Sequence, residues 1–452
     1  MTREADPHFD EPWPHGTLAA VMTTDLSGTV VRLVGLAAAV ADFPAPVGAV
    51  VRIERSAAAP LEAEVIGFRD DLTLVYPLGD VEGVRRGNRV RLVRTARRLR
   101  VGDALLGRVI DAHGKAIDGR PQCVPLSRVP LVRQPPGPMQ RPRIDEPLST
   151  GIRAIDGLLT CGKGQRIGIF SAAGVGKSVA LGMMCRSSSA DVKVIALVGE
   201  RGREVTEFIE RDLGPAGLAT SVVVAATSDE PALKRIHAAL AATAIAEHFR
   251  DQGRDVLLIV DSLTRFALAQ REIGLSAGEP STTRGWPPSV FAQLPKLIER
   301  AGRSERGSIT GFYSVLVEGD DPNEPISDAV RGLLDGHVML SRKLAGRGHY
   351  PAIDLLDSLS RLMPAVAGAG QLAAATTIRE LLAAYREHED LISIGAYRSG
   401  ANPTVDLAIE MRSEIETYLR QGIGESSTIA SARDELSALV GRCNQRRHAA
   451  AA

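Results

Sequence analysis

The sequence predicts a multidomain protein with three folded parts: a small N-terminal β-barrel, a central α/β domain built on a mostly parallel sheet, and a C-terminal α-helical domain. Three observations lead to this prediction. Short apolar-alternating runs occupy residues 23–96, strands and helices alternate after residue 150, and apolar residues recur at helical spacing beyond residue 365. The length of 452 residues fits about three domains at ~150 residues each.

Charge and composition exclude several classes of protein. The chain carries 54 Lys and Arg against 54 Asp and Glu, and hydrophobic residues make up 44% of it. These values are ordinary for globular proteins, so they exclude a wholly disordered chain. A dedicated nucleic-acid binder normally carries a basic excess, which the balanced charge does not provide. We therefore expect no nucleic acid among the partners.

The N-terminal stretch and the cysteines indicate a cytoplasmic protein. Residues 1–16 contain acidic side chains and no apolar core, so they do not resemble a secretory signal. We also expect no membrane-spanning segment, because the longest uncharged stretch, residues 213–228, falls short of the ~18 residues required. The four cysteines are scattered without a CxxC pair, which is typical of reduced thiols.

The predicted barrel follows a polar tail, residues 1–22, in which Pro7, Pro12 and Pro14 disfavour a long helix. Between residues 23 and 96, short candidate strands are separated by Gly and Pro, and this spacing favours a small barrel. The five candidate strands are TVVRLVG, GAVVRIE, LEAEVIGF, DLTLVYPLG and NRVRLVR. The Gly- and Pro-rich connector that follows, residues 97–150, is assigned to the central domain, residues 97–364.

Beyond the connector, buried-type strands alternate with helical stretches, which favours a mostly parallel sheet. The predicted strands are Arg166–Phe170, Val194–Gly199, Ser221–Thr227 and Val256–Asp261. The C-terminal domain, residues 365–452, carries two apolar stripes at helical spacing, which we interpret as core faces rather than partner sites. The stripes are Ile378, Leu381, Leu382 and Tyr385, and Ile429, Ala432, Leu436 and Leu439/Val440.

The segment SAAGVGKS, Ser171–Ser178, directly follows the predicted strand RIGIF and is typical of a phosphate-binding loop. In such a loop, backbone N–H groups and the start of the next helix point at phosphate oxygens. Lys177 would reach the β- and γ-phosphates of ATP, and the Ser178 hydroxyl would bind Mg²⁺. The usual first residue of the phosphate-binding pattern is Gly or Ala, whereas this chain has Ser171. The alternative interpretation of the segment is an ordinary glycine turn. The predicted nucleotide-binding residues of the loop are Ala173, Gly174, Val175, Gly176, Lys177, Ser178 and Val179.

Two carboxylates are expected near this loop. Asp261 ends the apolar strand VLLIVD, where a carboxylate can hold the metal or its water shell, although buried strands also end in capping Asp residues. Glu200 ends another strand and could orient and partly deprotonate the water that attacks ATP. Arg265, four residues after Asp261, is a candidate phosphate contact. On spacing alone, the charges around Glu200 could also solvate a helix start, and Arg265 could be a surface arginine.

Long contiguous stretches of the chain resemble the ATPases of type III protein export systems, which are homologues of the catalytic β subunit of rotary ATP synthases. The resemblance covers essentially residues 24–425. It is carried by GQRIGIFSAAGVGKS, LVGERGREVTEFIE, IVDSLTRFALAQREIG, GSITGFYSVLVEGDDPNEPISDAVRGLLDGH and GHYPAID. The segments KSVALGMM, STTRGWPPSVF and PISDAVRG look closer to the flagellar branch of this family than to its injectisome branch. The resemblance implies a RecA-like P-loop ATPase core that uses ATP and Mg²⁺.

The resemblance also implies roles for individual residues. Glu200 matches the catalytic glutamate of the family, Arg201 and Arg265 match phosphate-sensing arginines, and Glu204 matches a second acid near the water. Tyr350, in GHYPAID, matches a tyrosine that stacks on adenine; without the resemblance it would be interpreted as a core aromatic. The predicted catalytic residues are thus Lys177, Glu200, Arg201, Arg265 and Arg361, and the predicted metal ligands are Ser178 and Asp261.

Arg361, in DSLSRLM, matches the arginine finger that reaches the nucleotide of a neighbouring subunit. The resemblance therefore implies a homohexameric ring with each site at a subunit interface. The barrel would close one end of the ring, and the helical domain would face the export gate and a coiled-coil stalk protein. The other implied partners are a regulatory stator protein, export chaperones and their substrates, and the membrane export gate, contacted peripherally. The implied function is MgATP hydrolysis that energises the export of flagellar proteins from the cytoplasmic side of the inner membrane.

Some residues depart from the family pattern, and these departures help to choose between the alternative functions. Ile423 stands about where synthase β subunits carry an adenine-packing Phe, and SIGAYRSGANPTVDLAIEMR replaces their acidic lever, which disfavours an ion-translocating synthase subunit. Zero net charge and only 4% aromatic residues disfavour a Rho-like nucleic-acid translocase. An injectisome ATPase remains the nearer alternative. The Pro-containing tail differs from the amphipathic helix with which relatives bind the stator, so that contact stays open.

Overall fold

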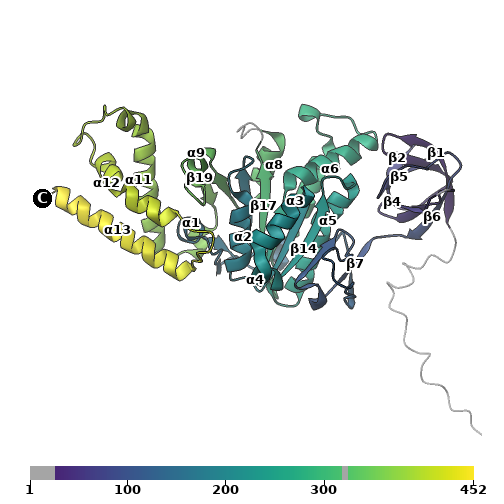
Figure 1. The fold of residues 1–452 in the computed structure, drawn as a ribbon, viewed down its shortest axis with the longest axis horizontal. Coiled ribbons are helices and arrows are strands. Elements are labelled where there is room, and N and C mark those ends of the chain that lie inside the picture. The colour runs from purple at the N-terminus through teal and green to yellow at the C-terminus, as the bar shows by residue number, and fades with distance from the viewer. Residues whose placement is uncertain (1–25, 57, 318–323, 452) are drawn as a thin grey trace, which may run out of the picture.

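The structure is a computed structural model that describes residues 26–56, 58–317 and 324–451. The N-terminal barrel and the C-terminal helices lie at opposite ends of an elongated molecule, with the central sheet between them (Figure 1). The predicted fold class is confirmed by this arrangement. The boundaries proposed between the three parts stay predictions. In the described part of the chain, no helix is long and apolar enough to cross a membrane.

Six strands close the N-terminal barrel in the order β1-β2-β5-β4-β3-β6. They are β1 (Ser27–Val34), β2 (Ala37–Ala41), β3 (Val50–Ile53), β4 (Leu61–Arg69), β5 (Leu72–Pro77) and β6 (Arg89–Arg94). The prediction of five strands was wrong by one, because it missed β2. This strand is mostly alanine, which has little intrinsic preference for strands. Its place is set by tertiary packing instead: Ala38 and Val40 belong to the barrel core.

The central sheet has nine strands in the order β19-β18-β12-β17-β15-β13-β14-β8, with β16 beside β17. From β18 to β8 the neighbouring strands are parallel, whereas β19 and β16 pair antiparallel. The strands are β8 (Arg108–Asp111), β12 (Arg166–Ser171), β13 (Val192–Glu200), β14 (Ser221–Thr227), β15 (Asp255–Asp261), β16 (Gly302–Arg303), β17 (Ser308–Leu316), β18 (Gly336–Leu340) and β19 (Ile353–Ser360). Two small antiparallel pairs accompany it: β7 (Arg98–Val101) with β9 (Ser127–Pro130), and β10 (Pro147–Leu148) with β11 (Cys161–Gly162).

Helices cover both faces of this sheet and form the C-terminal domain. They are α1 (Arg153–Leu158), α2 (Lys177–Ser187), α3 (Gly202–Glu207), α4 (Gly214–Ala219), α5 (Ala232–Asp251), α6 (Leu263–Ser276), α7 (Pro288–Ile298), α8 (Pro325–Leu333), α9 (Arg342–Gly346), α10 (Met363–Val366), α11 (Ala369–Ser393), α12 (Pro403–Leu419) and α13 (Ile429–Ala451). A π-helical turn, Phe208–Leu213, links α3 to α4.

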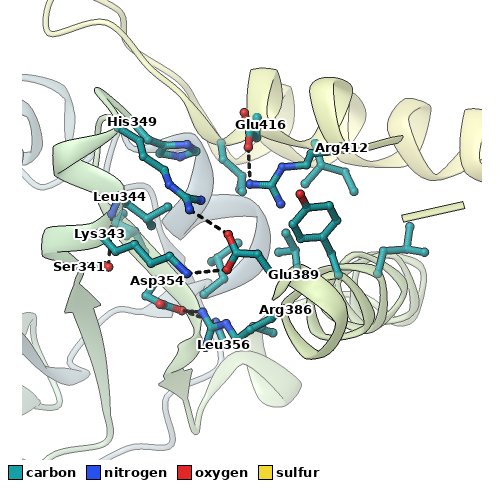
Figure 2. A pocket seen from close by; sticks show the side chains of 18 of the residues that line it. Ser341, Lys343, Leu344, His349, Asp354, Leu356, Arg386, Glu389, Arg412 and Glu416 are labelled. Atoms are coloured by element: carbon teal, nitrogen blue, oxygen red, sulfur yellow. Dashed lines mark hydrogen bonds and ion pairs between the residues drawn. The ribbon is translucent and has the colours of Figure 1, made fainter. Parts of the chain in front are cut away.

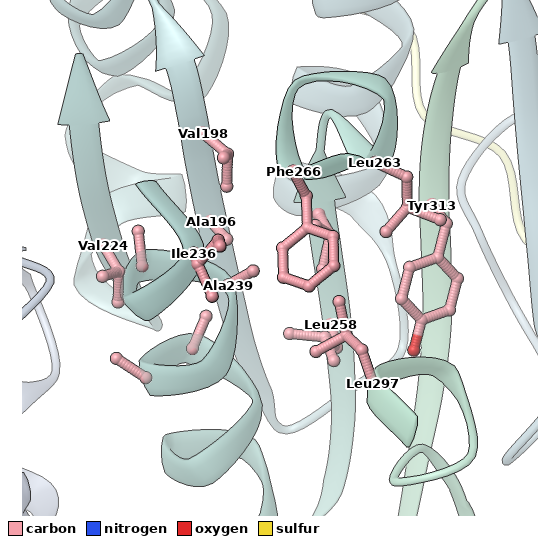
Figure 3. Packing of buried hydrophobic residues seen from close by; sticks show 14 of the residues in the cluster. Ala196, Val198, Val224, Ile236, Ala239, Leu258, Leu263, Phe266, Leu297 and Tyr313 are labelled. Atoms are coloured by element: carbon pink, nitrogen blue, oxygen red, sulfur yellow. The ribbon is translucent and has the colours of Figure 1, made fainter. Parts of the chain in front are cut away.

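Successive side chains along a central strand enter two different cores, one on each face of the sheet. Ala196 and Val198 of β13 pack in one core with Phe266 of α6 and Ile236 of α5, as Figure 3 shows. Leu197, which lies between them in the sequence, belongs to a second core with residues of α2 and of the C-terminal helices. Because both faces are buried there, the central strands β14 and β15 are apolar between their ends, and their polar residues stand at the ends.

The apolar stripes of the C-terminal domain are core faces, as predicted. Ile378 and Leu381 of α11 are buried, and so are Ala432, Leu436 and Leu439 of α13. Except for Ala432, all of these belong to the core that also contains the α2 side of the sheet. The helical domain is therefore packed directly onto the domain that carries the phosphate-binding loop.

Candidate nucleotide-binding site

The predicted phosphate-binding loop connects the end of β12 to the start of α2. Gly174 and Gly176 adopt φ angles of 78° and 87°, a region that favours glycine because it has no Cβ. Gly176 is the N-cap of α2, and Lys177 is the first residue of that helix. The unpaired N–H groups of a helix start together with its dipole form a binding site for anions.

Ser171, the departure from the usual pattern, is the last residue of β12 and is buried. Its carbonyl accepts a hydrogen bond of 3.0 Å from the N–H of Val317. A residue in regular strand conformation needs no glycine, so serine at this position leaves the loop intact. Among the other predicted loop residues, Ala173 is exposed, Val175 is buried, and Ser178 and Val179 are half-buried.

Lys177 lies between two carboxylates at the carboxyl ends of the central strands. Its Nζ is ion-paired with Oδ1 of Asp261 and lies 3.8 Å from Oε1 of Glu200. Ser314 of β17 donates a hydrogen bond of 2.5 Å to the same Oδ1 of Asp261. The structure thus brings together four residues that are far apart in the sequence. The bound phosphate of a nucleotide would compete with Asp261 for the lysine.

Glu200 has the electrostatics of a group that can exchange a proton near neutral pH. Burial, followed by the negative charge of Asp261, raises the pKa of Glu200 to about 7, while the positive charges of Lys177 and Arg265 act in the opposite direction. Its Oε1 accepts no hydrogen bond from any side chain or backbone group of the described residues. Oε1 still lies within ion-pair distance of Lys177 and of Arg265, at 3.8 and 3.3 Å. A carboxylate oxygen without a hydrogen-bond donor, on a group with a pKa near the working pH, is suited to act as a general base on water.

Arg201 and Glu204 form the outer rim of the same cluster. Nη1 of Arg201 lies 2.9 Å from Oε1 of Glu204, and the arginine side chain is 72% exposed. A hydrogen bond with Glu200, followed by the contacts with Arg201, lowers the pKa of Glu204. Glu204 therefore keeps its negative charge beside the carboxyl group of Glu200.

Tyr350 lies beside the loop, on the segment between α9 and β19. A Cβ atom added to Gly176 would stand 3.3 Å from Cε1 of the tyrosine ring, so a side chain at position 176 would press on the ring. Tyr350 is 45% exposed, which is unusual for so large an aromatic side chain. The sequence alone favoured a core aromatic, whereas the structure places a partly exposed ring beside the loop.

The segment that carries Tyr350 is anchored to the C-terminal domain (Figure 2). Glu389 of α11 pairs with Lys343 of α9 and with Nη2 of Arg347, the latter at 2.9 Å. These residues line a small cavity of about 120 Å³ between α9, α11 and α12. The position of the tyrosine is therefore tied by charge pairs to the helices that are expected to face other proteins.

Arg361 lies away from the loop of its own chain. It directly follows β19, which runs antiparallel to β18, and its N–H donates to the carbonyl of Asp335 at 3.0 Å. This places it beside the start of β12, whereas the loop follows the end of that strand, roughly 17 Å farther along at ~3.3 Å per residue. Arg361 is exposed.

The residues near Lys177 fit a nucleotide-bound magnesium ion better than a resident metal. In the described residues, no group of three or more His, Cys, Asp or Glu side chains is arranged to hold a metal. Mg²⁺ in nucleotide sites is typically held by one or two protein oxygens together with phosphates and water. The hydroxyl of Ser178 and the carboxylate of Asp261 are oxygen donors of this kind.

The sequence reasoning missed Ser314 and Thr264. Thr264, in α6, accepts a hydrogen bond of 2.9 Å from the N–H of Leu316 and joins the start of that helix to the end of β17. Both residues depend on β17, one of the five strands of the central sheet that were not predicted; the others are β8, β16, β18 and β19. The run SITGFYSVL is apolar and β-prone, and recognising it as a central strand would have made Ser314 a candidate, because it stands near the strand's carboxyl end.

Comparison with known proteins identifies relatives along almost the whole chain. The sequence model of the ATP synthase alpha/beta family, nucleotide-binding domain, matches residues 151–360, and that of the T3SS EscN ATPase C-terminal domain matches residues 367–438. The flagellum-specific ATP synthase of Bacillus subtilis is 51% identical over 84% of this chain and 87% of its own length. The type 3 secretion system ATPase of Xanthomonas euvesicatoria is 49% identical over 91% of this chain and 94% of its own. The solved structure of the assembled ATPase EscN in complex with its central stalk EscO, from enteropathogenic E. coli, is 44% identical, covers 91% of this chain and 100% of that chain, and has a TM-score of 0.84.

Proposed function

Since this chain belongs to the family of flagellum-specific ATP synthases and type III secretion ATPases and is an ATPase of type III export, we propose that it uses Mg²⁺-dependent ATP hydrolysis to energise the export of flagellar proteins. The observation that carries the catalytic part of this proposal is the cluster of Lys177, Glu200 and Asp261 at the carboxyl ends of parallel strands, directly beside the loop of residues 171–178.

In the proposed reaction, the loop amides and Lys177 bind the β- and γ-phosphates of ATP. Oε1 of Glu200, which accepts no hydrogen bond from the described residues, accepts a proton from water, whose oxygen attacks the γ-phosphorus as the bond to the β-phosphate oxygen breaks. Arg265 holds the Glu200 carboxylate and, with Arg201, adds positive charge close to the transferred phosphoryl group. Mg²⁺, held by Ser178 and Asp261, would neutralise charge on the phosphate oxygens. Adenine would stack on the partly exposed ring of Tyr350.

The proposed assembly is a homohexameric ring in which Arg361 reaches the nucleotide of the neighbouring subunit. Its exposure and its distance from the loop of its own chain support a role in trans. The assembled form of EscN and its complex with the central stalk EscO support a ring and a stalk partner for this chain as well. Such a finger typically contributes ~10³- to 10⁵-fold to turnover.

The remaining partners are proposed on the same basis: a regulatory stator protein, export chaperones with their substrates, and a membrane export gate contacted peripherally from the cytoplasm. The flagellar system is proposed ahead of the injectisome because of the segments KSVALGMM, STTRGWPPSVF and PISDAVRG. In the host, deletion of the gene should abolish flagellar filaments and motility. Loss of effector secretion with normal motility would assign the chain to an injectisome.

The catalytic proposal is tested with Lys177→Ala. Removing the ammonium group should abolish ATP binding or turnover, measured by steady-state phosphate release and by binding of a fluorescent ATP analogue. Lys163→Ala is the matched control, because Lys163 pairs with Asp255 at the opposite ends of the strands. Normal activity of the Lys177 variant would overturn the proposed site.

A further inference from the structure

A basic groove lies where the barrel joins the central domain. We call it the arginine groove; it has a volume of about 1010 Å³, and its charged lining residues are Arg94, Arg98, Arg100, Lys115 and Arg128. All five cations are exposed, and no acidic side chain is among the described residues that line the groove. This concentration of one sign favours the binding of a partner of opposite charge.

The strand pairing concentrates the positive charge. Arg100 of β7 stands directly opposite Arg128 of β9, and like charges in such cross-strand pairs are destabilising. Arg98 stands two residues before Arg100 and therefore projects from the same face of the ribbon. Three guanidinium groups are thus presented together, and a bound anion would relieve their repulsion.

Acidic residues close to the groove are engaged in other contacts. Oδ1 of Asp111 accepts hydrogen bonds of 2.9 and 2.8 Å from the backbone N–H groups of His113 and Lys115, which line the groove. Asp118 pairs with Arg108 at 2.6 Å, and Glu62 and Glu64 pair with Arg97 at 2.7 and 3.3 Å. Against five cations, these carboxylates leave the groove with an excess of positive charge.

The N-terminal segment, residues 1–25, has the complementary charge, and the first described residue after it, Leu26, lies next to the groove. The segment carries Glu4, Asp6, Asp10, Glu11 and Asp25 against a single basic residue, Arg3. The chain enters the described structure at Leu26, whose carbonyl accepts a hydrogen bond of 2.9 Å from the N–H of Leu92.

The register of the barrel places the first described residues close to the groove. Ser27 of β1 pairs antiparallel with Arg91 of β6, and Leu26 bonds to Leu92, which directly precedes the groove residues Val93 and Arg94. Fifteen residues can span up to about 50 Å when extended, so the acidic residues at positions 4–11 are within reach of all five cations.

We propose that the acidic N-terminal segment docks in the arginine groove of its own chain. The segment then occupies a surface that an acidic partner protein would otherwise use, so docking and partner binding are mutually exclusive. The docking proposal goes beyond the proposed ATPase function and does not depend on it, because no residue of the segment or of the arginine groove lies at the nucleotide site.

A native cysteine makes the proposal testable in the full chain. Cys123 lines the groove and is half-buried, whereas Cys161, Cys185 and Cys443 are buried. A cysteine introduced as His8→Cys, between the acidic residues of the segment, should be joined to Cys123 of the same chain by a short bis-maleimide. Mass spectrometry of the peptides identifies the link, and dilution shows that it forms within one chain.

Charge reversal supplies the decisive comparison. In the His8→Cys background, Arg98→Glu, Arg100→Glu and Arg128→Glu together should slow crosslinking about tenfold, since several exposed ion pairs are lost. The matched control makes the same charge change on the barrel surface: Arg32→Glu, Arg52→Glu and Arg86→Glu. Equal crosslinking rates in the two variants, or links that join only different chains, would overturn the proposal.

A second variant keeps the proposal testable if the charge-reversed groove fails to fold. Glu4→Gln, Asp6→Asn, Asp10→Asn and Glu11→Gln neutralise the segment and leave the groove unchanged. They should slow crosslinking to a similar extent, and 1 M NaCl should do the same to the unmodified pair, because screening then acts within ~3 Å. A crosslinking rate insensitive to both changes would contradict docking by charge.

Discussion

The guanidinium group of Arg265 contacts both carboxylate oxygens of Glu200: its Nε lies 3.3 Å from Oε1 and its Nη2 lies 3.3 Å from Oε2. The relationship follows from the sheet order, because β15 and β13 are neighbours and α6, which carries Arg265, begins just after β15. The arginine fixes the orientation of a carboxyl group that burial would otherwise leave protonated. It is the contact through which the pH dependence of catalysis can be examined.

The elevated pKa of Glu200 predicts a pH-dependent ATPase. Only the deprotonated form can accept a proton from water, so kcat/KM should rise with pH through a midpoint near pH 7, where burial and Asp261 place the pKa. In Arg265→Ala, one opposing positive charge is lost, and the midpoint should move to higher pH in addition to any loss of rate. Arg271→Ala, on the same helix, is the control. A midpoint near pH 4.5 in the wild type would show that the burial effect does not operate.

Tyr350 should determine the affinity for the base of the nucleotide. Tyr350→Ala removes the stacking surface beside Gly176 and should raise KM for ATP about tenfold with a smaller change in kcat. Tyr350→Phe keeps the ring and should behave like the wild type. A KM that is unchanged in the alanine variant, measured over a full ATP titration, would remove Tyr350 from the site.

Arg361→Ala should separate assembly from catalysis. Because Arg361 is exposed and lies away from the loop of its own chain, the variant should still form rings but lose about 10³-fold or more in turnover at every protein concentration. Sedimentation and phosphate release are measured on the same samples. If activity instead followed dissociation into monomers and returned at high concentration, Arg361 would be a structural residue.

A buried ion pair should be important for stability. Glu247 of α5 and Arg300, which follows α7, are each 2% exposed and are joined by two hydrogen bonds of 2.8 Å. Glu247→Ala leaves a buried charge unpaired and should lower the free energy of unfolding by ~3–5 kcal/mol in denaturant titrations. Replacing both residues, with Glu247→Leu and Arg300→Met, should cost much less. Equal losses in the two variants would show that packing rather than charge governs this position.

Much of the architecture could be predicted from the sequence because residues with reactive or charged side chains stand directly at the ends of recognisable apolar strands. Glu200 and Asp261 were recognised because each ends a continuously apolar strand, and the loop was recognised from its glycines. The strand β2 could not be recognised, since its alanines are buried by packing rather than by strand preference. The ion pair between Lys177 and Asp261, and the pKa of Glu200, depend on which strands are neighbours. Strand order is set by long-range packing, which local sequence does not specify.

The central claim, that Glu200 activates water in an ATPase site built around Lys177, is tested most directly by Glu200→Gln. The glutamine keeps the size of the side chain but cannot accept the proton. The variant should bind MgATP with nearly wild-type affinity, while steady-state phosphate release falls by about 10²- to 10⁴-fold. Hydrolysis at the wild-type rate, with equal ATP affinity, would contradict the account and place the base elsewhere.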